Sequence, residues 1–159
     1  MLIREAAIDD FSFFKEMLYE AFFWEISAAR PNYEDFQYNA EFLKHIKDWG
    51  RHDDMTLIGE LSGMRIGAVW YRKWTAENHS YGFVNAHTPE IGIAVANNNR
   101  GEGVGRKLLQ SILRKARLAG FPAISLSVNP RNYARKLYES EGFKCVEDSD
   151  ASITMICKL

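Results

Sequence analysis

The chain has 159 residues, of which 13% are aromatic, and its formal net charge is −1. This length and composition fit one globular domain over residues 1–159 with a sizeable core. A net charge so close to zero argues against a broad nucleic-acid surface, so we expect no nucleic-acid partner. No apolar run is long enough to span a bilayer and no signal peptide is recognised, so we expect no membrane partner and a cytoplasmic location.

The two cysteines, Cys145 and Cys157, both fall in apolar segments that resemble strands. We expect them to be reduced core residues of a cytosolic protein. A nucleophilic role for either thiol has no support in the surrounding sequence. No spacing of cysteine and histidine indicates a metal site, so no metal is expected.

The first half of the chain predicts strands and helices from the period of its apolar residues. Gly50 is expected to stop the second helix, and Ser62-Gly63 to form the turn of a hairpin. The expected elements are a strand over 2–6, a helix from Asp9 or Asp10 to about Pro31, a helix over 33–49, and strands over 55–61 and 64–74.

The second half begins with a loop over residues 75–89, of which 81–84 are expected to be extended. Gly120 and Pro122 mark the exit of a long helix, and Gly142 ends the last one. The expected elements are a strand over 90–96, a glycine-rich turn, a helix to Ala119, a strand over 123–128, a helix over 131–141, and a closing hairpin of 143–146 with 152–159.

The stretch over residues 95–109 changes from the period of a strand to that of a helix, across glycines at 101, 103 and 105. A strand, a glycine-rich turn and a helix in this order aim free backbone N–H groups at one point. Such a point suits an anion, most often phosphate. Arg100 and Arg106 are expected to add positive charge on either side.

Two common phosphate-binding motifs do not fit this stretch. The spacing to Lys107 is wrong for a Walker A loop, and no Ser or Thr follows it. Arg106 occupies the place of the third glycine of a dinucleotide fingerprint. A plain glycine-rich connection between strand and helix is the alternative.

The pattern Arg100-x-x-Gly103-x-Gly105 resembles the acetyl-coenzyme A (acetyl-CoA) pyrophosphate loop of the GNAT N-acetyltransferase superfamily. A second family segment, Asn-x-Ala-x-x-Leu-Tyr-x-x-x-Gly-Phe, is matched further along the chain. Its matching positions are Asn132, Ala134, Leu137, Tyr138, Gly142 and Phe143. The order of expected elements also matches, so the resemblance covers essentially the whole chain. One departure is Asn98, where the family often has proline.

The resemblance implies an α/β GNAT (acyl-CoA N-acyltransferase) fold: a mixed, mostly antiparallel sheet with splayed central parallel strands, flanked by helices. It also implies acetyl-CoA as co-substrate, with its pyrophosphate on loop N–H groups and its pantetheine arm along the preceding strand. An N–H near Val95 would polarise the thioester carbonyl. The residues implied to bind the coenzyme are Ile93, Ala94, Val95, Arg100, Gly101, Glu102, Gly103, Val104, Gly105, Arg106, Asn132 and Ala134.

An amine acceptor must lose a proton before it attacks, because a free alkylamine is mostly protonated near neutral pH. Glu90 matches an acidic position of the family and is the first candidate for this base; an exposed strand-end carboxylate is the alternative. Tyr138 matches the family tyrosine near the coenzyme sulfur and would assist the leaving thiolate; a half-buried helix aromatic is the alternative. No motif supports His87, His79 or Glu25, the other candidate bases.

The resemblance implies transfer of the acetyl group from acetyl-CoA to a primary amine, of a small molecule or a peptide, by direct attack in a ternary complex. The alternatives are a non-catalytic acyl-CoA-binding sensor and a nucleotide-binding domain that uses the same loop. The identity of the acceptor stays open, as does a homodimer. Aromatic residues that could line the acceptor site, or belong to the core, are those at 22–24, 33, 36 and 38, with Trp70, Tyr71 and Trp74.

Overall fold

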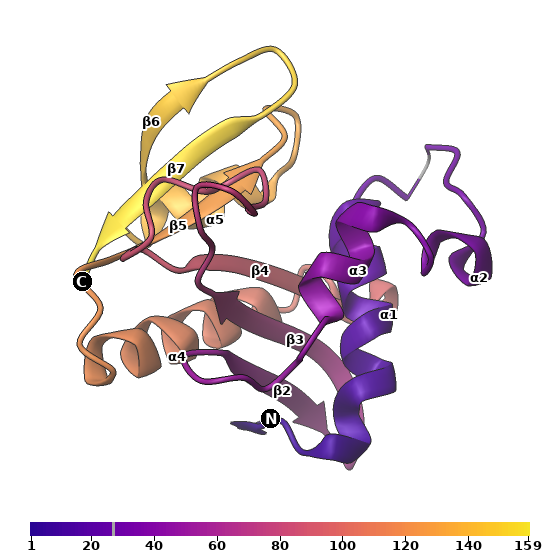
Figure 1. Ribbon diagram of the computed structural model, residues 1–159. Coiled ribbons are helices and arrows are strands. Elements are labelled where there is room, and N and C mark those ends of the chain that lie inside the picture. Colours follow the sequence, from indigo (N-terminus) through magenta and orange to yellow (C-terminus); the bar gives the residue numbers. More distant parts are fainter. Residues whose placement is uncertain (27) are drawn as a thin grey trace.

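A seven-stranded mixed sheet forms the centre of the computed structural model, which describes residues 1–26 and 28–159 (Figure 1). Its strands lie in the order β1-β2-β3-β4-β5-β7-β6. The strands are β1 (Leu2–Glu5), β2 (Met55–Leu61), β3 (Met64–Arg72), β4 (Glu90–Val95), β5 (Ala123–Val128), β6 (Lys144–Asp148) and β7 (Ile153–Lys158). The helices are α1 (Phe11–Phe22), α2 (Tyr33–Phe36), α3 (Ala40–Ile46), α4 (Val104–Leu118) and α5 (Ala134–Ser140), with 3-10 turns η1 (Ile8–Asp10) and η2 (Asn97–Asn99). Within the described ranges, no helix combines the length and apolar character needed to cross a membrane.

Neighbouring strands of the sheet run antiparallel except β4 and β5, which run parallel. β4 pairs with β3 along its whole length, but its ladder with β5 holds the single registered pair Glu90 and Ser125 in the described chain. Beside that pair, the Ser125 N–H donates to the Pro89 carbonyl (3.0 Å). The two parallel strands therefore separate beyond one pair, and the expected mixed sheet with splayed central strands is confirmed.

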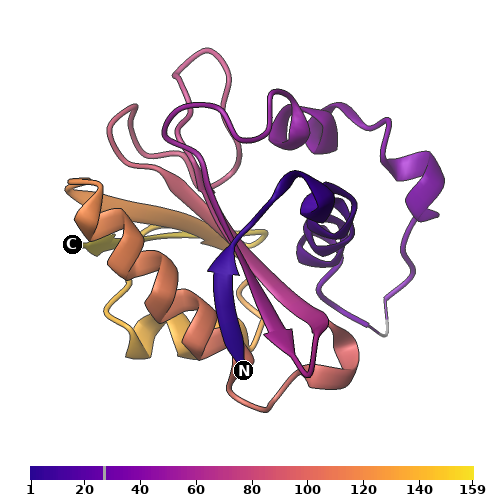
Figure 2. The same cartoon turned by 90° about the horizontal axis from the view of Figure 1, so that it is seen from below.

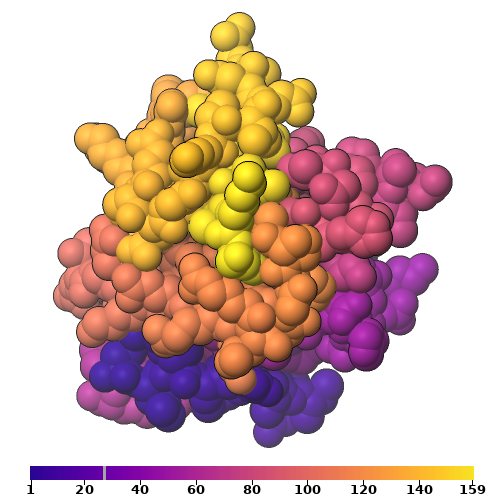
Figure 3. Space-filling view, turned by 90° about the vertical axis from the view of Figure 1, so that its left-hand side faces the viewer, coloured from indigo at the N-terminus to yellow at the C-terminus, as the bar shows by residue number. Residues whose placement is uncertain are grey.

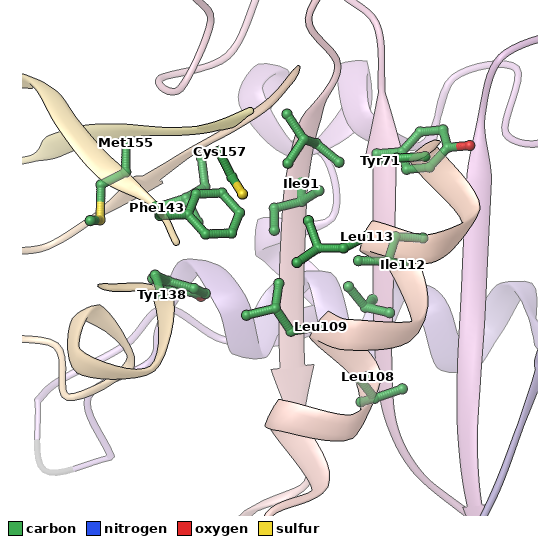
Figure 4. Close-up of a cluster of buried hydrophobic side chains, with 14 of the residues drawn as sticks. Tyr71, Ile91, Leu108, Leu109, Ile112, Leu113, Tyr138, Phe143, Met155 and Cys157 are labelled. Carbon is green, nitrogen blue, oxygen red and sulfur yellow. The ribbon is translucent and has the colours of Figure 1, made fainter. Parts of the chain in front are cut away.

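Helices cover both faces of the sheet, so each face has its own apolar core (Figure 2). Side chains alternate along β4, so Ile91 joins the core under α4 while Ala94 joins the core under α1. The buried stripe of α4 has helical spacing and consists of Val104, Leu108, Leu109, Ile112, Leu113 and Ala116. Figure 4 shows Leu109 and Leu113 of this stripe beside Ile91 of β4.

The core under α4 extends beneath both halves of the sheet. It contains Leu57 and Val69 from β2 and β3, and also Ile124 and Met155 from β5 and β7. Figure 3 shows this side of the molecule, where the α4 region in orange lies between the N-terminal region in indigo and the closing hairpin in yellow. Apolar packing thus joins two halves that share little backbone pairing.

The first helix is shorter than the sequence predicts. It was expected to end near Pro31, but α1 ends at Phe22, and Phe23 leaves the helical region with φ −116° and ψ 56°. The side chain of Arg30 donates to the Phe23 carbonyl (3.0 Å) and pairs with Glu20 (3.0 Å). Arg30 therefore contacts the end of α1, where further helical turns were expected.

The single helix expected over residues 33–49 is also wrong, because two short helices replace it. Asn39 takes an extended conformation between them, and its side-chain oxygen accepts from the Glu41 N–H (2.9 Å). Asn32 caps α2 in the same way, through the Glu34 N–H (2.8 Å). Asparagine is a strong N-cap, so each one starts a new helix where apolar spacing alone predicted continuity.

Three smaller expectations also differ from the structure. Residues 81 and 82 form a turn and residues 83 and 84 belong to no strand, so the expected extended segment is absent there, and the last helix starts at Ala134, not at residue 131. Cys157 is buried as expected, but Cys145 is exposed. The reason is that β6 is an edge strand whose residues are all exposed.

Candidate functional site

Two cavities meet where β4 and β5 separate. The larger, about 980 Å³, lies between the two strands and extends along the 99–106 loop to α5; we call it the cleft. The smaller, about 340 Å³, lies on the α1 side of the sheet; we call it the pocket. Trp24, Gly92, Ser127 and Asn132 line both cavities, so a ligand in one can touch a ligand in the other.

The loop before α4 presents a row of free backbone N–H groups to the cleft. Gly101 and Gly103 have φ of 81° and 80°, a backbone conformation that favours glycine. The Arg100 N–H donates to the Asn97 carbonyl (3.4 Å), and the Lys107 N–H donates to the Gly103 carbonyl (3.2 Å). The N–H groups of residues 101–106 donate to no backbone carbonyl of the described residues. Free N–H groups at the positive end of a helix suit an anion, so the predicted anion site stays a prediction that this geometry allows.

The Arg100 side chain does not point into this anion site. Its Nε donates to the Val95 carbonyl (3.0 Å), and its Nη1 donates to the Trp24 carbonyl (3.1 Å). Its Nη2 lies 3.4 Å from the Glu20 carboxylate, while burial lowers the pKa of the guanidinium. Arg100 therefore ties the loop to the segment after α1.

The expectation of free positive charge on either side of the loop is corrected by these ion pairs. Arg106 forms a salt bridge with Glu141, and its Nη1 also donates to Ser140 Oγ (3.1 Å). Because both arginines are neutralised by carboxylates, the backbone N–H groups are the main anion-binding groups of the loop.

The backbone of β4 offers hydrogen-bonding groups to the gap. The Ala96 N–H donates to the Ile66 carbonyl of β3 (2.8 Å), and backbone groups alternate along a strand. The N–H and C=O groups of Ile93 and Val95 therefore face the gap, whereas those of Ala94 face β3. Since Arg100 occupies the Val95 carbonyl, the Val95 N–H is the group left there.

On the other side of the cleft lie Asn132 and α5. The Asn132 side-chain oxygen accepts from the Ala134 N–H (2.9 Å), so its amide NH₂ stays available to the cavities. Tyr138 is buried beside Phe143 (Figure 4), with ring centroids 5.8 Å apart, and it lines the cleft. Burial raises the pKa of its phenol, so the hydroxyl keeps its proton and can act as a donor.

Glu90, the first residue of β4, lines the pocket and is not an exposed strand-end carboxylate. Its Oε1 accepts from the Gly82 N–H (3.1 Å), while Oε2 is buried without a partner in the described chain. Burial raises the pKa of this carboxyl to about 7, against the opposing effects of the Gly82 N–H and the Trp74 side chain. A carboxyl poised near neutral pH can accept a proton at working pH.

Gly82 covers the Glu90 carboxyl on the side of β5. No pattern in the sequence predicts this role. A Cβ at this position would lie 2.6 Å from the Leu126 carbonyl carbon, 2.7 Å from Ser127 N and 2.9 Å from Glu90 Cδ. The turn at residues 80–82 thus lies directly against β5 and the carboxyl, which only a residue without a side chain allows.

The aromatic residues expected near an acceptor divide between the pocket and the core. Phe22, Trp24, Trp70 and Trp74 line the pocket. The remaining aromatic residues lie outside the pocket walls. Phe23, Tyr33 and Phe36 pack in the core on the α1 side. Tyr71 packs in the core under α4, and Tyr38 is exposed.

The other candidate bases lie outside the pocket walls. One histidine that the sequence analysis did not single out, His45, does line the pocket. His79 stacks on Phe83 (4.5 Å between centroids), His87 is exposed, and Glu25 lies 3.4 Å from Arg131 at the cleft. His45 of α3 lines the pocket with Nε2 3.2 Å from Ser80 Oγ. Burial lowers its pKa to about 3, so it is neutral.

A mixed sheet split by a cleft, with a glycine-rich loop at one end and a buried carboxyl at the other, defines an α/β protein with two adjoining cavities. The model of the Acetyltransferase (GNAT) family matches residues 14–143, and the chain belongs to this family. No curated protein matches the sequence.

Several solved structures share the fold. A ribosomal-protein-alanine N-acetyltransferase from Brucella melitensis is 22% identical, with a TM-score of 0.72 and full coverage of both chains. YncA from Salmonella typhimurium, a putative acetyltransferase with its cofactor acetyl-CoA, is 21% identical over 100% of this chain and 94% of its own, with a TM-score of 0.73. The PaiA N-acetyltransferase from Thermoplasma acidophilum, in complex with coenzyme A, is 17% identical over 99% and 98%, with a TM-score of 0.71.

The close contact at Gly82 predicts that Gly82→Ala changes the pKa of Glu90. The added methyl must push the turn away from β5, which removes the Gly82 hydrogen bond but admits water to the carboxyl. Because burial is the larger cause of the raised pKa, we expect that pKa to fall toward its ordinary value of 4.5. NMR titration of the Glu90 carboxyl, assigned with Glu90→Gln, measures it.

Gly105→Ala is the matched control, because a Cβ there makes only ordinary contacts at 3.7 and 3.8 Å, far from the carboxyl. It should leave the titration of Glu90 unchanged. A folded Gly82→Ala variant with the wild-type pKa would contradict the role assigned to this turn.

Proposed function

We propose that this chain transfers the acetyl group from acetyl-CoA to a primary amine, by direct attack of the amine in a ternary complex. The observation that carries the proposal is the meeting of two cavities at shared walls, with Tyr138 in one and Glu90 in the other. Membership of the family supports acetyl transfer, and two similar structures contain acetyl-CoA or coenzyme A.

In this proposal, the cleft binds the coenzyme. The N–H groups of residues 101–106 hold its pyrophosphate, as the anion site at the start of α4 favours. The pantetheine arm pairs with the gap-facing backbone of Ile93 and extends the interrupted ladder between β4 and β5, which leaves the Val95 N–H for the thioester carbonyl. Asn132 contributes its free amide NH₂, and its bond to the Ala134 N–H fixes its orientation.

The reaction needs one base and one donor. Glu90 takes a proton from the bound ammonium group, and the free amine nitrogen then attacks the thioester carbonyl carbon. The Val95 N–H stabilises the negative charge that develops on the carbonyl oxygen. As the carbon–sulfur bond breaks, the sulfur leaves as a thiolate, and the Tyr138 hydroxyl donates a hydrogen bond or proton to it. The nitrogen loses its second proton to water, which leaves the neutral amide and coenzyme A as products.

A cytoplasmic location and a homodimer are separate proposals. Both cysteines are free, which suits a reducing compartment. Light scattering of the purified chain tests the dimer.

Gly105→Val should weaken coenzyme A binding strongly without unfolding the chain. Gly105 lines the cleft, and a Cβ there makes ordinary contacts with Leu137 and Val95, but the two methyl groups of valine extend toward the N–H groups of the loop. We expect affinity to fall by on the order of a hundredfold, measured by calorimetric titration. Gly105→Ala, with one methyl group, is the control and should lose much less.

Gly103 is less suited to this test, because its φ of 80° would strain any other residue. A folded Gly105→Val variant that binds coenzyme A normally would show that the loop is not the pyrophosphate site.

Glu90→Gln should move the pH profile of the reaction. If Glu90 takes the proton from a bound ammonium ion, kcat/KM for the amine rises as this carboxyl ionises, near its pKa of about 7. Without the base, the amine must first lose its proton to water, so the rise should move toward the amine's own pKa, near about 10. At neutral pH, we expect kcat/KM to fall by about a hundred- to ten-thousandfold.

The profile is measured from steady-state rates of coenzyme A release, with the affinity for acetyl-CoA as the control. A rise that stays at the same pH in the Gln variant would remove Glu90 as the base. Binding of acetyl-CoA without turnover of any amine would favour a sensor instead.

Tyr138→Phe separates chemistry from binding, because it keeps the ring and removes only the hydroxyl. A hydrogen bond to sulfur strengthens as charge builds in the transition state, so the acetyl-transfer rate should fall by roughly ten- to a thousandfold. Affinity for acetyl-CoA should change little, since a thioester sulfur is a poor acceptor. Single-turnover transfer at saturating amine measures the step directly. An unchanged rate, with an unchanged melting temperature, would exclude Tyr138 from the mechanism.

A further inference from the structure

Arg72 is the arginine among the described residues that line the pocket, and it has no N–H donor left for a ligand. Arg72 is 4% exposed and forms five hydrogen bonds, which use all five of its N–H donors. Nε and Nη2 donate to the carboxylate of Asp54 at 3.1 and 2.6 Å. Nη1 donates to the carbonyls of Lys44 (3.0 Å) and Lys47 (2.8 Å), and Nη2 donates also to that of Asp48 (3.4 Å).

The remaining polar walls of the pocket do not supply a positive charge either. His45 is neutral, because burial lowers its pKa to about 3, and its Nε2 contacts Ser80. Lys44 is directed elsewhere, since its Nζ donates to the His79 carbonyl (2.6 Å). Among the described residues that line the pocket, Glu90 is the one carboxyl group, and its Oε2 has no partner.

Aromatic and aliphatic side chains form a large part of the walls around this carboxyl. Phe22 and Trp74 each contact the His45 ring, at centroid distances of 5.7 and 5.0 Å, and Trp70 and Leu18 add further apolar surface. A volume of about 340 Å³ lies at the small end of the range for ligand pockets. It holds a small molecule with one ring or a short branched chain.

We propose that the acceptor is a small primary monoamine with an uncharged aromatic or aliphatic body and no anionic group. The inference rests on the proposed function and deepens it. The ammonium group meets Glu90, and the body is buried between the aromatic walls. An acceptor that carried a carboxylate or phosphate would bury that charge beside Glu90 without a free cation to pair it.

The test compares three acceptors that differ at one carbon. They are 2-phenylethylamine, phenylalanine, which adds a carboxylate, and phenylalaninamide, which adds a neutral group of the same shape. With acetyl-CoA and the full chain, we expect kcat/KM for phenylalanine to be lower than for 2-phenylethylamine by about a hundredfold or more. Phenylalaninamide should keep within about tenfold of 2-phenylethylamine, which separates charge from size.

A pair of variants tests where the body of the amine binds. Phe22 and Phe36 belong to one aromatic cluster, with ring centroids 5.5 Å apart, but Phe36 is not among the described residues that line either cavity. Phe22→Ala should lower kcat/KM for 2-phenylethylamine by about ten- to a hundredfold, with unchanged affinity for coenzyme A. Phe36→Ala, the matched control, should leave kcat/KM unchanged, and melting temperatures show the stability cost of each.

The relative rates with these acceptors decide between a monoamine acceptor, a polypeptide acceptor and no acetyl transfer. Equal rates for phenylalanine and 2-phenylethylamine would overturn the inference while leaving acetyl transfer intact. Faster acetylation of a peptide beginning with alanine, or of a lysine peptide, would also overturn it and assign a polypeptide acceptor. If coenzyme A binds but neither the three amines nor the peptides are acetylated, the proposed function itself fails, and this inference fails with it.

Discussion

The interrupted pairing of β4 and β5 is the constraint on which the rest of the structure depends. One registered pair, Glu90 with Ser125, fixes the two strands at one end, and beyond it they diverge. A strand that leaves its neighbour exposes unpaired N–H and C=O groups, which normally invite another strand. Here the gap becomes a cleft instead, because the core under α4 holds both halves of the sheet in place from one side.

That arrangement also explains how the cleft and the pocket come to share walls. Arg100 joins the two regions, because one guanidinium binds the Val95 carbonyl at the end of β4 and the Trp24 carbonyl after α1. Trp24 lines both cavities. The Arg100 side chain therefore links the loop at the cleft to the segment that contributes Trp24 to the pocket wall.

Local patterns predicted the elements that depend on nearby residues. The glycine spacing and apolar stripe of residues 95–118 predicted the strand, the glycine-rich loop and α4, since each depends on residues close together in the sequence. The break at Asn39 was missed because a cap competes with apolar period, and period alone cannot show which one wins. The burial of Glu90 was also beyond local reading, because it depends on Gly82 and on β5, which are brought together only by the fold.

The buried carboxyl of Glu90 is costly to the fold, which argues that it serves a function. Its pKa in the folded chain lies above the ordinary value of 4.5, so the folded state holds its proton more tightly than the unfolded state. Its contribution to stability is therefore full below pH 4.5 and is lost as the pH rises toward about 7. The loss by neutral pH and above is on the order of 3 kcal/mol, a large share of the stability of a small domain. A leucine or glutamine would avoid that cost, so the proposed role as a base gives a physical reason for a carboxyl that is buried, half-satisfied and open to an aromatic pocket.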